Sequence, residues 1–316
     1  MQLRPLGKTG LSIAPLVFGG NVFGWTADEK TSFDLLDAFT GAGFNAIDTA
    51  DVYSSWAPGN AGGESETVIG KWLKRSAVAR DRVVIVTKVG SDMGEGRKGL
   101  RKARIVEAVE ASLQRLRTDH IDLYLSHWPD AETPYEETLE AHAALVAAGK
   151  VRAFGASNLD AGQLQASFEA ADAAGLPRYG VLQPEYNLYD RAGFEGALAD
   201  LCMKEEIGVI TYFSLASGFL TGKYRTPADT EGRARGEDVA RYLDDRGLRI
   251  LAALDRVAAE TGASPAEITL AWLMAKPAVT APIASATSLA QLASLMKAAA
   301  LALSAEQLAM LDAAGA

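Results

Sequence analysis

The sequence is poor in cysteine and histidine, the side chains that most often bind metal ions or act as nucleophiles and bases. It contains one cysteine, Cys202, and three histidines in 316 residues. A single cysteine excludes an internal disulfide and a zinc site built from several cysteines, so we expect Cys202 to be a buried apolar residue. No H-E-x-x-H or G-x-S-x-G motif occurs. These absences argue against a zinc protease and a serine hydrolase, and we expect no metal at the functional site.

Positive charge and long apolar runs are also scarce. The chain carries 31 Lys and Arg against 40 Asp and Glu, a net charge of −9. Nucleic acids are bound by clustered basic faces, so this balance argues against nucleic acid as the main partner. No apolar stretch reaches the roughly 18 residues of a membrane helix, and the opening MQLRPLGKTG lacks the apolar core of a signal peptide. We therefore expect a soluble, cytoplasmic protein with neither nucleic acid nor membrane as a partner.

Short apolar runs alternate with longer stretches of helical periodicity along the chain. Eight such runs are partly β-branched and apolar throughout, as expected of strands buried on both faces. They span residues 14–20, 45–48, 83–88, 121–128, 151–158, 180–187, 207–214 and 279–285. Eight strand–helix units predict a (β/α)₈ TIM barrel, and we expect residues 1–316 to form one domain. A hairpin around residues 8–10 should cover the barrel bottom, and residues 265–275 predict an extra helix before the last strand.

A doubly wound sheet is the alternative architecture, and it needs a glycine fingerprint after its first strand. The segment GAGFNA, residues 41–46, matches G-x-G-x-x-A. It follows a helical pattern and precedes a strand, the reverse of the required order, so we expect Gly41 and Gly43 to end a helix. Elsewhere, capping boxes predict helix starts at Thr133, Asp160, Ser264 and Ser304.

Polar side chains recur at the carboxyl ends of the predicted strands. In a barrel these ends meet at one mouth, where active sites are built. A lysine that ends the apolar run VVIVTK is costly to bury and needs a carboxylate partner. Asp48, at the end of the neighbouring strand, is the expected partner of Lys88. The polar strand ends are Asp48, Lys88, His127, Ser157, Asn158, Gln183, Tyr212, Ser214 and Ser285.

Tyr53 follows Asp48 in the segment IDTADVYSSW and should lie above the predicted ion pair. A phenol has a pKa near 10, too high for efficient acid–base catalysis at neutral pH, and a nearby lysine cation lowers it. His127, on the next strand along the barrel, could share the same substrate oxygen. This set of groups suits the polarisation of a carbonyl while another agent supplies hydride.

These residues lie in segments that resemble the aldo-keto reductase family, over nearly the whole chain. The resemblance is to the bacterial branch that is also similar to the β-subunits of potassium channels. The matching segments occur in the family's order and at family-like spacing. They are DTADVYSS (48–55), TKV (87–89), SHW (126–128), GASN (155–158), LQPEYNLYDR (182–191) and YFSLASGFLTGKY (212–224).

The resemblance implies a catalytic tetrad of Asp48, Tyr53, Lys88 and His127. It also implies an NAD(P)H across the barrel mouth, without a Rossmann fold, and a small-molecule carbonyl or alcohol substrate. Side-chain amides supply the donors and acceptors that a carboxamide needs, and an aromatic ring offers a stacking face. The implied cofactor-binding residues are Ser157, Asn158 and Gln183 at the carboxamide, Tyr212 under the nicotinamide, and Phe213, Ser214, Leu215, Gly218, Leu220, Gly222 and Lys223 around the pyrophosphate.

Cofactor choice depends on two segments. Family members that choose NADPH often carry lysine or arginine in the segment that corresponds to residues 282–292, and this chain has Ser285, Thr287 and Gln291 there. The long loop from 213 to about 240 could supply the missing cation, and its length is itself typical of a functional loop. It contains Arg225, Arg233 and Arg235, and we assign the contact to Arg233. We therefore expect NADPH to be preferred, with NADH usable.

The remaining aromatic and histidine residues divide by position. Trp25, Trp56 and Trp128 fall in predicted mouth segments and should line an apolar substrate pocket, whereas Trp72 and Trp272 fall in helical patterns and should be core. We expect His120 to be structural at the barrel bottom and His142 to be exposed on a helix.

Two other function classes can be weighed against the reductase. A nucleotide-sensing regulatory subunit would retain the cofactor site, and a metal-dependent barrel lyase would need a ligand cluster that the sequence lacks. No sequence feature indicates the oligomeric state.

Overall fold

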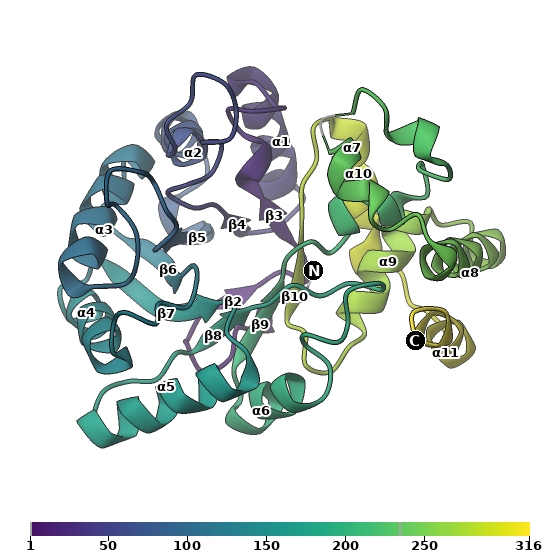
Figure 1. Ribbon diagram of the computed structural model, residues 1–316. Helices are drawn as coiled ribbons and strands as arrows, with labels where there is room; N and C mark the ends of the chain where they lie inside the picture. Colours follow the sequence, from purple (N-terminus) through teal and green to yellow (C-terminus); the bar gives the residue numbers. More distant parts are fainter. Residues whose placement is uncertain (1, 234) are drawn as a thin grey trace.

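Eight parallel strands form a closed barrel in the order β10-β3-β4-β5-β6-β7-β8-β9 (Figure 1). The computed structural model describes residues 2–233 and 235–316. The predicted (β/α)₈ barrel is confirmed, and the doubly wound alternative is wrong. The strands are β3 (Val17–Gly19), β4 (Ala46–Asp48), β5 (Val84–Val89), β6 (Ile121–Ser126), β7 (Val151–Ser157), β8 (Val181–Gln183), β9 (Gly208–Thr211) and β10 (Ala281–Ala284).

Helices surround the barrel and alternate with its strands. Between β3 and β9 the helices are α1 (Glu29–Gly41), α2 (Glu64–Arg75), α3 (Lys102–Leu116), α4 (Tyr135–Ala147), α5 (Ala161–Ala174) and α6 (Ala197–Glu205). The later helices are α7 (Gly236–Ala240), α8 (Asp245–Thr261), α9 (Pro265–Met274), α10 (Leu289–Lys297) and α11 (Ala305–Ala314). The predicted extra helix before the last strand is α9, and α1 ends at Gly41 as expected.

Three of the four predicted capping boxes are present. Asp160, Ser264 and Ser304 each accept a hydrogen bond from the backbone N–H three residues later, and the side chain there reaches back to the cap. The box predicted at Thr133 is wrong. Pro134, in an extended conformation, occupies the cap position of α4, so the helix begins one residue later. The Thr133 hydroxyl donates instead to Asp130 Oδ2 at 2.7 Å.

The N-terminal hairpin closes the barrel bottom, as predicted. Strand β1 (Arg4–Pro5) pairs antiparallel with β2 (Ser12–Ile13), and Leu6, Leu11 and Ile13 join the apolar cluster inside the barrel. Gly7 has φ +56°, and a Cβ there would lie 2.5 Å from the backbone nitrogen of Gly208. Only glycine allows so close an approach, which seats the hairpin against the strand ends.

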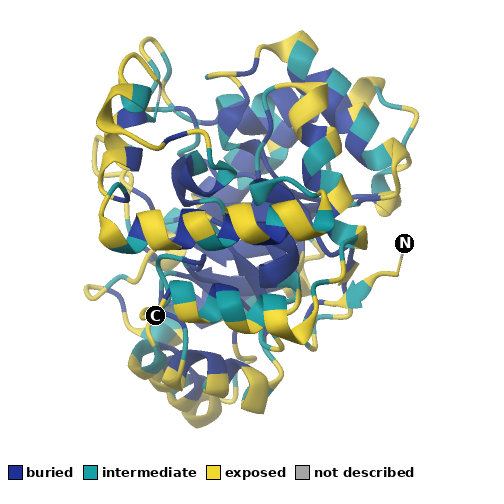
Figure 2. Cartoon of the chain, turned by 90° about the vertical axis from the view of Figure 1, so that its right-hand side faces the viewer, coloured by how far each residue is buried: buried dark blue, intermediate teal, exposed yellow. Residues whose placement is uncertain are grey.

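A second apolar layer fills the space between the strands and the helices, whose outer faces are exposed (Figure 2). Trp72, Trp272 and Cys202 are buried there, as predicted, and burial raises the pKa of Cys202 to about 12. The expectation that His142 is exposed is wrong. The buried face of α4 carries it, and its ring stacks on Phe154 of β7 at 5.1 Å. Burial lowers the pKa of His142 to about 3, so this imidazole is neutral.

Candidate active site

Seven of the nine polar strand ends continue the inward-facing row of their strand, whereas Asn158 directly follows Ser157 and Ser214 lies beyond the end of β9. Side chains alternate between the two faces of a strand, so residues two apart point the same way. On β5 the interior residues Val84 and Val86 are followed by Lys88. On the other strands the polar residue likewise follows an interior position by two residues. The pairs are Ala46 and Asp48, Leu125 and His127, Gly155 and Ser157, Val181 and Gln183, Ile210 and Tyr212, and Ile283 and Ser285. These side chains therefore share the mouth at the carboxyl ends of the strands.

Lys88 is the centre of the site. It is fully buried, and its Nζ lies 2.8 Å from Asp48 Oδ2, 2.8 Å from the Thr49 carbonyl oxygen and 2.7 Å from the Tyr53 hydroxyl. These contacts use all three ammonium donors. The Tyr53 hydroxyl donates to Asp48 Oδ2 at 3.1 Å, and Gln183 Nε2 donates to Asp48 Oδ1 at 2.8 Å. The predicted ion pair is therefore present, with Tyr53 in direct contact with both partners.

The electrostatics of Tyr53 differ from the sequence-based expectation. Burial raises the pKa of Tyr53 well above 10, and the adjacent Asp48 carboxylate adds to this rise. The hydrogen bond from Lys88 favours the phenolate, but burial also lowers the pKa of Lys88, against the opposing effect of Asp48. The prediction that Lys88 brings the pKa of Tyr53 below its usual value is therefore wrong. Tyr53 is a protonated phenol at neutral pH and has a proton to donate.

His127 lies beside Tyr53, with 6.1 Å between the two ring centroids. Burial and the nearby Lys88 charge hold the pKa of His127 well below its usual value, so the imidazole is neutral. Its Nδ1 lies 2.9 Å from the hydroxyl of Ser91, a residue to which the sequence assigned no role. When Ser91 donates this hydrogen bond, Nε2 carries the ring proton and becomes a neutral donor.

Ser157, Asn158 and Tyr212 form one hydrogen-bonded network. The Tyr212 hydroxyl donates to Asn158 Oδ1 at 2.6 Å, and Asn158 Nδ2 donates to the His127 carbonyl oxygen at 2.8 Å. Ser157 Oγ donates to the Gln183 carbonyl oxygen at 2.7 Å. Tyr212 packs on the apolar cluster of the barrel interior. The network fixes the Tyr212 ring and the Asn158 side-chain amide at one edge of the mouth, and the Gln183 side-chain amide is held separately by Asp48.

The segment after β9 has an unusual backbone. Phe213, Ala216, Ser217, Gly218 and Gly222 all have positive φ values, between 48° and 98°. Turns of this kind can present backbone N–H groups to an anion such as phosphate. In this segment the N–H groups of Ala216, Gly218, Leu220 and Gly222 donate to carbonyl oxygens of the segment itself, so such a contact would come from the other N–H groups of the segment. Any contact of this segment with a pyrophosphate would come mainly from its backbone, because the side chains of Leu215 and Leu220 pack into the core and the Ser214 hydroxyl donates to the Thr211 carbonyl oxygen. Lys223 lies beside Tyr224, with 4.9 Å between Nζ and the ring centroid.

Most of the residues that could decide the choice between NADPH and NADH already form hydrogen bonds or ion pairs with other side chains. Ser285 Oγ donates to Asn21 Oδ1 at 2.6 Å, and Thr287 Oγ1 donates to Gln291 Oε1 at 3.1 Å. Arg225 forms a two-pronged ion pair with Asp255 of α8, at 2.7 and 2.8 Å. Arg233 is exposed. Among the loop arginines that could bind the cofactor 2′-phosphate, Arg225 is therefore already paired with a carboxylate.

The three predicted pocket tryptophans lie around Tyr53 and His127. Trp56 contacts Trp25 and Tyr53, with centroid distances of 5.7 and 6.0 Å, and Trp128 stacks on His127 at 5.8 Å. About half of the surface of Trp56 and of Trp128 is exposed, at 48% and 49%. The structure thus places partly exposed aromatic rings beside the Tyr53 hydroxyl.

A buried polar layer behind the site was not anticipated. Glu66 of α2 accepts from Thr87 Oγ1 and from Arg115 Nε, both at 2.6 Å. Asp51 Oδ2 lies 3.3 Å from Arg104 of α3. Thr87 precedes Lys88 on β5 and faces outward, so this layer backs the strand that carries the lysine. Nothing in the sequence spacing relates residues of α2 and α3, which is why the layer was missed.

Asp51 makes stability depend on pH. Burial and the charge of Glu66 raise the pKa of Asp51 to about 7, against the opposing effect of Arg104. An acid with a raised folded-state pKa binds its proton more tightly in the folded chain, so its contribution to stability is most favourable near pH 4 and falls as pH rises toward 7. We expect Asp51→Asn to remove this decline, which is on the order of 4 kcal/mol for a shift of about three units.

The measurement is urea unfolding between pH 4.5 and 8 for both proteins. The exposed Asp81→Asn is the matched control and should leave the slope unchanged. A slope that persists in Asp51→Asn would show that another group titrates.

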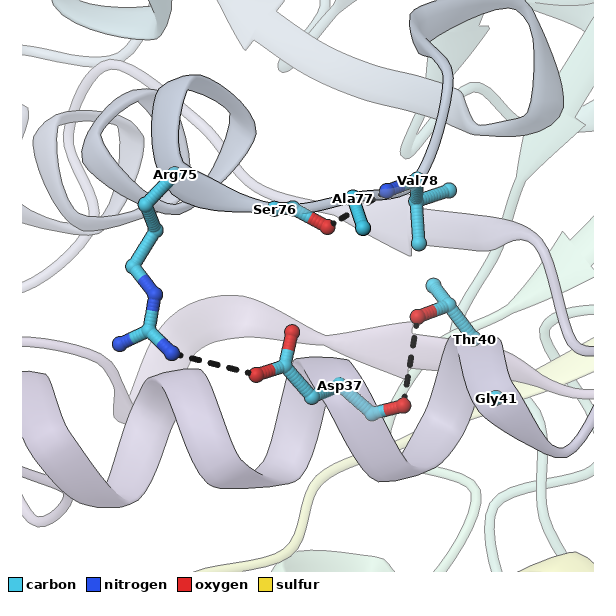
Figure 3. A pocket seen from close by; sticks show the side chains of 7 residues that line it. All are labelled: Asp37, Thr40, Gly41, Arg75, Ser76, Ala77 and Val78. Carbon is cyan, nitrogen blue, oxygen red and sulfur yellow. Dashed lines mark hydrogen bonds and ion pairs between the residues drawn. The ribbon is translucent and has the colours of Figure 1, made fainter.

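A surface hollow of about 280 Å³ lies between the carboxyl ends of α1 and α2 (Figure 3). Asp37 and Thr40 of α1 and Arg75 at the end of α2 line it. The carboxyl ends of barrel helices lie at the opposite end of the barrel from the carboxyl ends of the strands. The hollow is therefore remote from Lys88 and Tyr53.

Across residues 2–233 and 235–316, no group of three or more His, Cys, Asp and Glu side chains is arranged to hold a metal ion. In the same part of the chain, no helix is both long and apolar enough to cross a membrane.

The chain is similar over most of its length to one known protein family and to several of its members. A sequence model of the Aldo/keto reductase family matches residues 15–316. An Arabidopsis thaliana protein named "Probable voltage-gated potassium channel subunit beta" is 36% identical over 305 residues, covering 94% of this chain and 91% of the relative. Two Bacillus subtilis relatives are each 34% identical. "Uncharacterized oxidoreductase YrpG" aligns over 99% of this chain and 95% of its own length, and "Aldo-keto reductase YhdN" over 88% and 82%. The predicted resemblance is confirmed, and these matches support a general oxidoreductase role.

Proposed function

The chain belongs to the aldo/keto reductase family, and from this premise we propose that it is an NAD(P)H-dependent reductase of aldehydes or ketones. The observation that carries the proposal is the contact of a protonated, part-buried Tyr53 with the buried Lys88–Asp48 pair. The carbonyl carbon gains hydride and its oxygen gains a proton, and the reverse reaction oxidises the alcohol. The substrate is a small carbonyl or alcohol compound.

Each residue of the proposed tetrad has a distinct task. Tyr53 gives its hydroxyl proton to the carbonyl oxygen, and Lys88 stabilises the phenolate that remains. Asp48 holds Lys88 in place and balances its charge. Neutral His127 donates a hydrogen bond to the same oxygen, in the orientation that its contact with Ser91 favours. A buried, preorganised set of donors stabilises the developing charge more strongly than water does.

A nicotinamide dinucleotide would supply the hydride when bound. We assign its carboxamide to Ser157, Asn158 and Gln183, because the two amides provide both donors and acceptors at one edge of the mouth. Tyr212 offers the stacking face, since its ring lies over the barrel interior. The left-handed backbone of residues 213–222 would hold the phosphates, with Lys223 adding positive charge.

The test is a screen of aldehydes, ketones and their alcohols with NADPH and NADH, monitored by nicotinamide absorbance. Turnover of at least one carbonyl that depends on cofactor is the expected result. Tight cofactor binding without turnover of any compound would contradict the proposal. It would favour a second candidate, a cofactor-binding regulatory subunit, which the 36% identity to proteins named potassium channel subunit beta makes worth testing.

We expect NADPH to be preferred over NADH by roughly ten- to hundred-fold in kcat/KM, the effect of one charge-assisted contact to the 2′-phosphate. Arg233 is the assigned contact, since Ser285, Thr287 and Gln291 offer no charge. The ratio of kcat/KM for the two cofactors should fall toward one in Arg233→Ala. Arg225→Ala is the matched control, because Arg225 is held by Asp255. A wild-type preference for NADH would refute the prediction.

A further inference from the structure

Asn187 lies in the loop that follows β8 and is fully buried. Its Oδ1 accepts hydrogen bonds from the backbone N–H groups of Tyr189 and Asp190, both at 2.8 Å. Its Nδ2 donates to Asp190 Oδ2 at 3.0 Å and to the Phe213 carbonyl oxygen at 3.1 Å. A side-chain amide has two N–H donors and an oxygen with two lone pairs, so every hydrogen-bonding position of Asn187 is occupied. Asn187 therefore acts on the site only through other residues.

Phe213, which receives one of these hydrogen bonds, is the first residue of the segment 213–222. Its φ is +49°, a left-handed conformation that is unfavourable for a residue with a Cβ. Its side chain is 41% exposed, so packing of the ring does little to hold the backbone in that conformation. The carbonyl oxygen is held instead, because it accepts from Asn187 and also from the Ala216 N–H at 2.7 Å. The Asn187 amide thus fixes the direction in which the segment leaves the barrel.

Asn187 is also connected to the middle of the same segment. Asp190 Oδ2, which accepts from Asn187, accepts a second hydrogen bond from the Tyr242 hydroxyl at 2.8 Å. Tyr242 follows α7, and its ring stacks on that of Phe219 with 5.4 Å between the centroids and 21° between the planes. Phe219 is a buried residue of the segment. One buried amide therefore links the start of the segment to the ring that packs against its middle.

On the basis of the proposed function, in which the segment 213–222 holds the cofactor phosphates, we propose that Asn187 is a positioning residue that sets the affinity for the dinucleotide without touching it. A segment that is already held in its binding conformation loses less conformational freedom when a ligand binds, so the ligand binds more tightly. Loss of the Asn187 amide releases the first turn of the segment. NADPH and NADH should be affected alike, because both carry the same pyrophosphate.

The test compares Asn187→Ala and Asn187→Ser in the full-length protein. A serine hydroxyl can still accept from the N–H groups of the turn at 187–190, but it ends one bond short of the Asn187 Nδ2 and loses the Phe213 carbonyl oxygen. Serine should therefore cost less stability than alanine and provide a variant that folds. Both variants should raise the Kd of NADPH and of NADH by about ten-fold, measured by fluorescence titration, as expected for loss of one hydrogen bond and the order it imposes. At saturating NADPH, kcat should not fall by more than about three-fold, because the residues of the proposed tetrad are unchanged.

Asn45→Ala is the matched control. The Asn45 amide also joins the backbone of two segments, since it accepts from the Ala14 N–H at 2.9 Å and donates to the Ser12 carbonyl oxygen at 3.0 Å. It precedes β4 and so lies at the barrel bottom, away from the mouth. Its loss should lower stability in urea and leave the Kd of both cofactors within about two-fold of the wild type. Amide hydrogen exchange of residues 213–222 should become faster in both Asn187 variants and stay unchanged in Asn45→Ala.

Three results would overturn the inference. These are unchanged cofactor affinity in both Asn187 variants, an equal loss of affinity in Asn45→Ala, and a loss of affinity for NADPH alone. The second would show general destabilisation, and the third would place the effect at the 2′-phosphate. Each of them rejects this inference and leaves the proposed function standing, whereas a wild type that binds neither dinucleotide rejects both.

Discussion

Replacement of Tyr53 by phenylalanine is expected to lower kcat for carbonyl reduction by about 10²- to 10⁴-fold, the usual contribution of a positioned general acid. The substitution keeps the ring against Trp56 and removes only the hydroxyl that contacts Lys88 and Asp48. No other described hydroxyl lies within hydrogen-bond distance of Lys88 Nζ. Loss of the proton donor should therefore not be compensated.

The measurement is steady-state turnover together with cofactor affinity from fluorescence titration. Cofactor affinity should stay within a few-fold of the wild type, because the proposed cofactor residues lie on other strands. Tyr189→Phe is the matched control, since it removes a tyrosine hydroxyl that donates to Asp244 at 2.7 Å, away from the ion pair. Near-normal turnover in Tyr53→Phe would remove Tyr53 from the mechanism.

Replacement of Lys88 by methionine should have an effect on turnover of similar size and should also destabilise the fold. Methionine retains the length of the side chain but leaves the Asp48 carboxylate buried without its cation, which costs about 3–5 kcal/mol in comparable pairs. In alcohol oxidation, Tyr53 must accept a proton as phenolate. Without the lysine cation, this step should need a higher pH, so the pH–rate profile should shift upward.

A double variant separates catalysis from stability. Adding Asp48→Asn to Lys88→Met removes the unpaired charge, and Gln183 Nε2 can still donate to the amide oxygen that then stands in place of the carboxylate. We expect urea unfolding to show recovery of much of the lost stability while turnover remains low. Recovery of turnover along with stability would show that Lys88 has only a structural role.

The sequence by itself determined the barrel and the positions of the residues of the proposed tetrad. A strand repeats every two residues, so the apolar row Val84, Val86 in VVIVTK already required Lys88 to face the barrel interior. A buried ammonium requires a carboxylate, and the adjacent strand ends in Asp48. Local patterns of this kind also indicated the capping boxes at Asp160, Ser264 and Ser304. These features follow from neighbours in the chain or from the closed geometry of a barrel.

Only the tertiary structure decided the electrostatics and the contacts between distant loops. The pKa of Tyr53 rises rather than falls, because desolvation depends on every atom packed around the hydroxyl and not on the nearest charge alone. Burial of His142 depends on which face of α4 meets β7. The ion pair of Glu66 with Arg115 and the contact of Arg235 with Trp25 join residues that no sequence period relates. Such contacts arise when separate segments pack, so their residues become neighbours only in the folded chain.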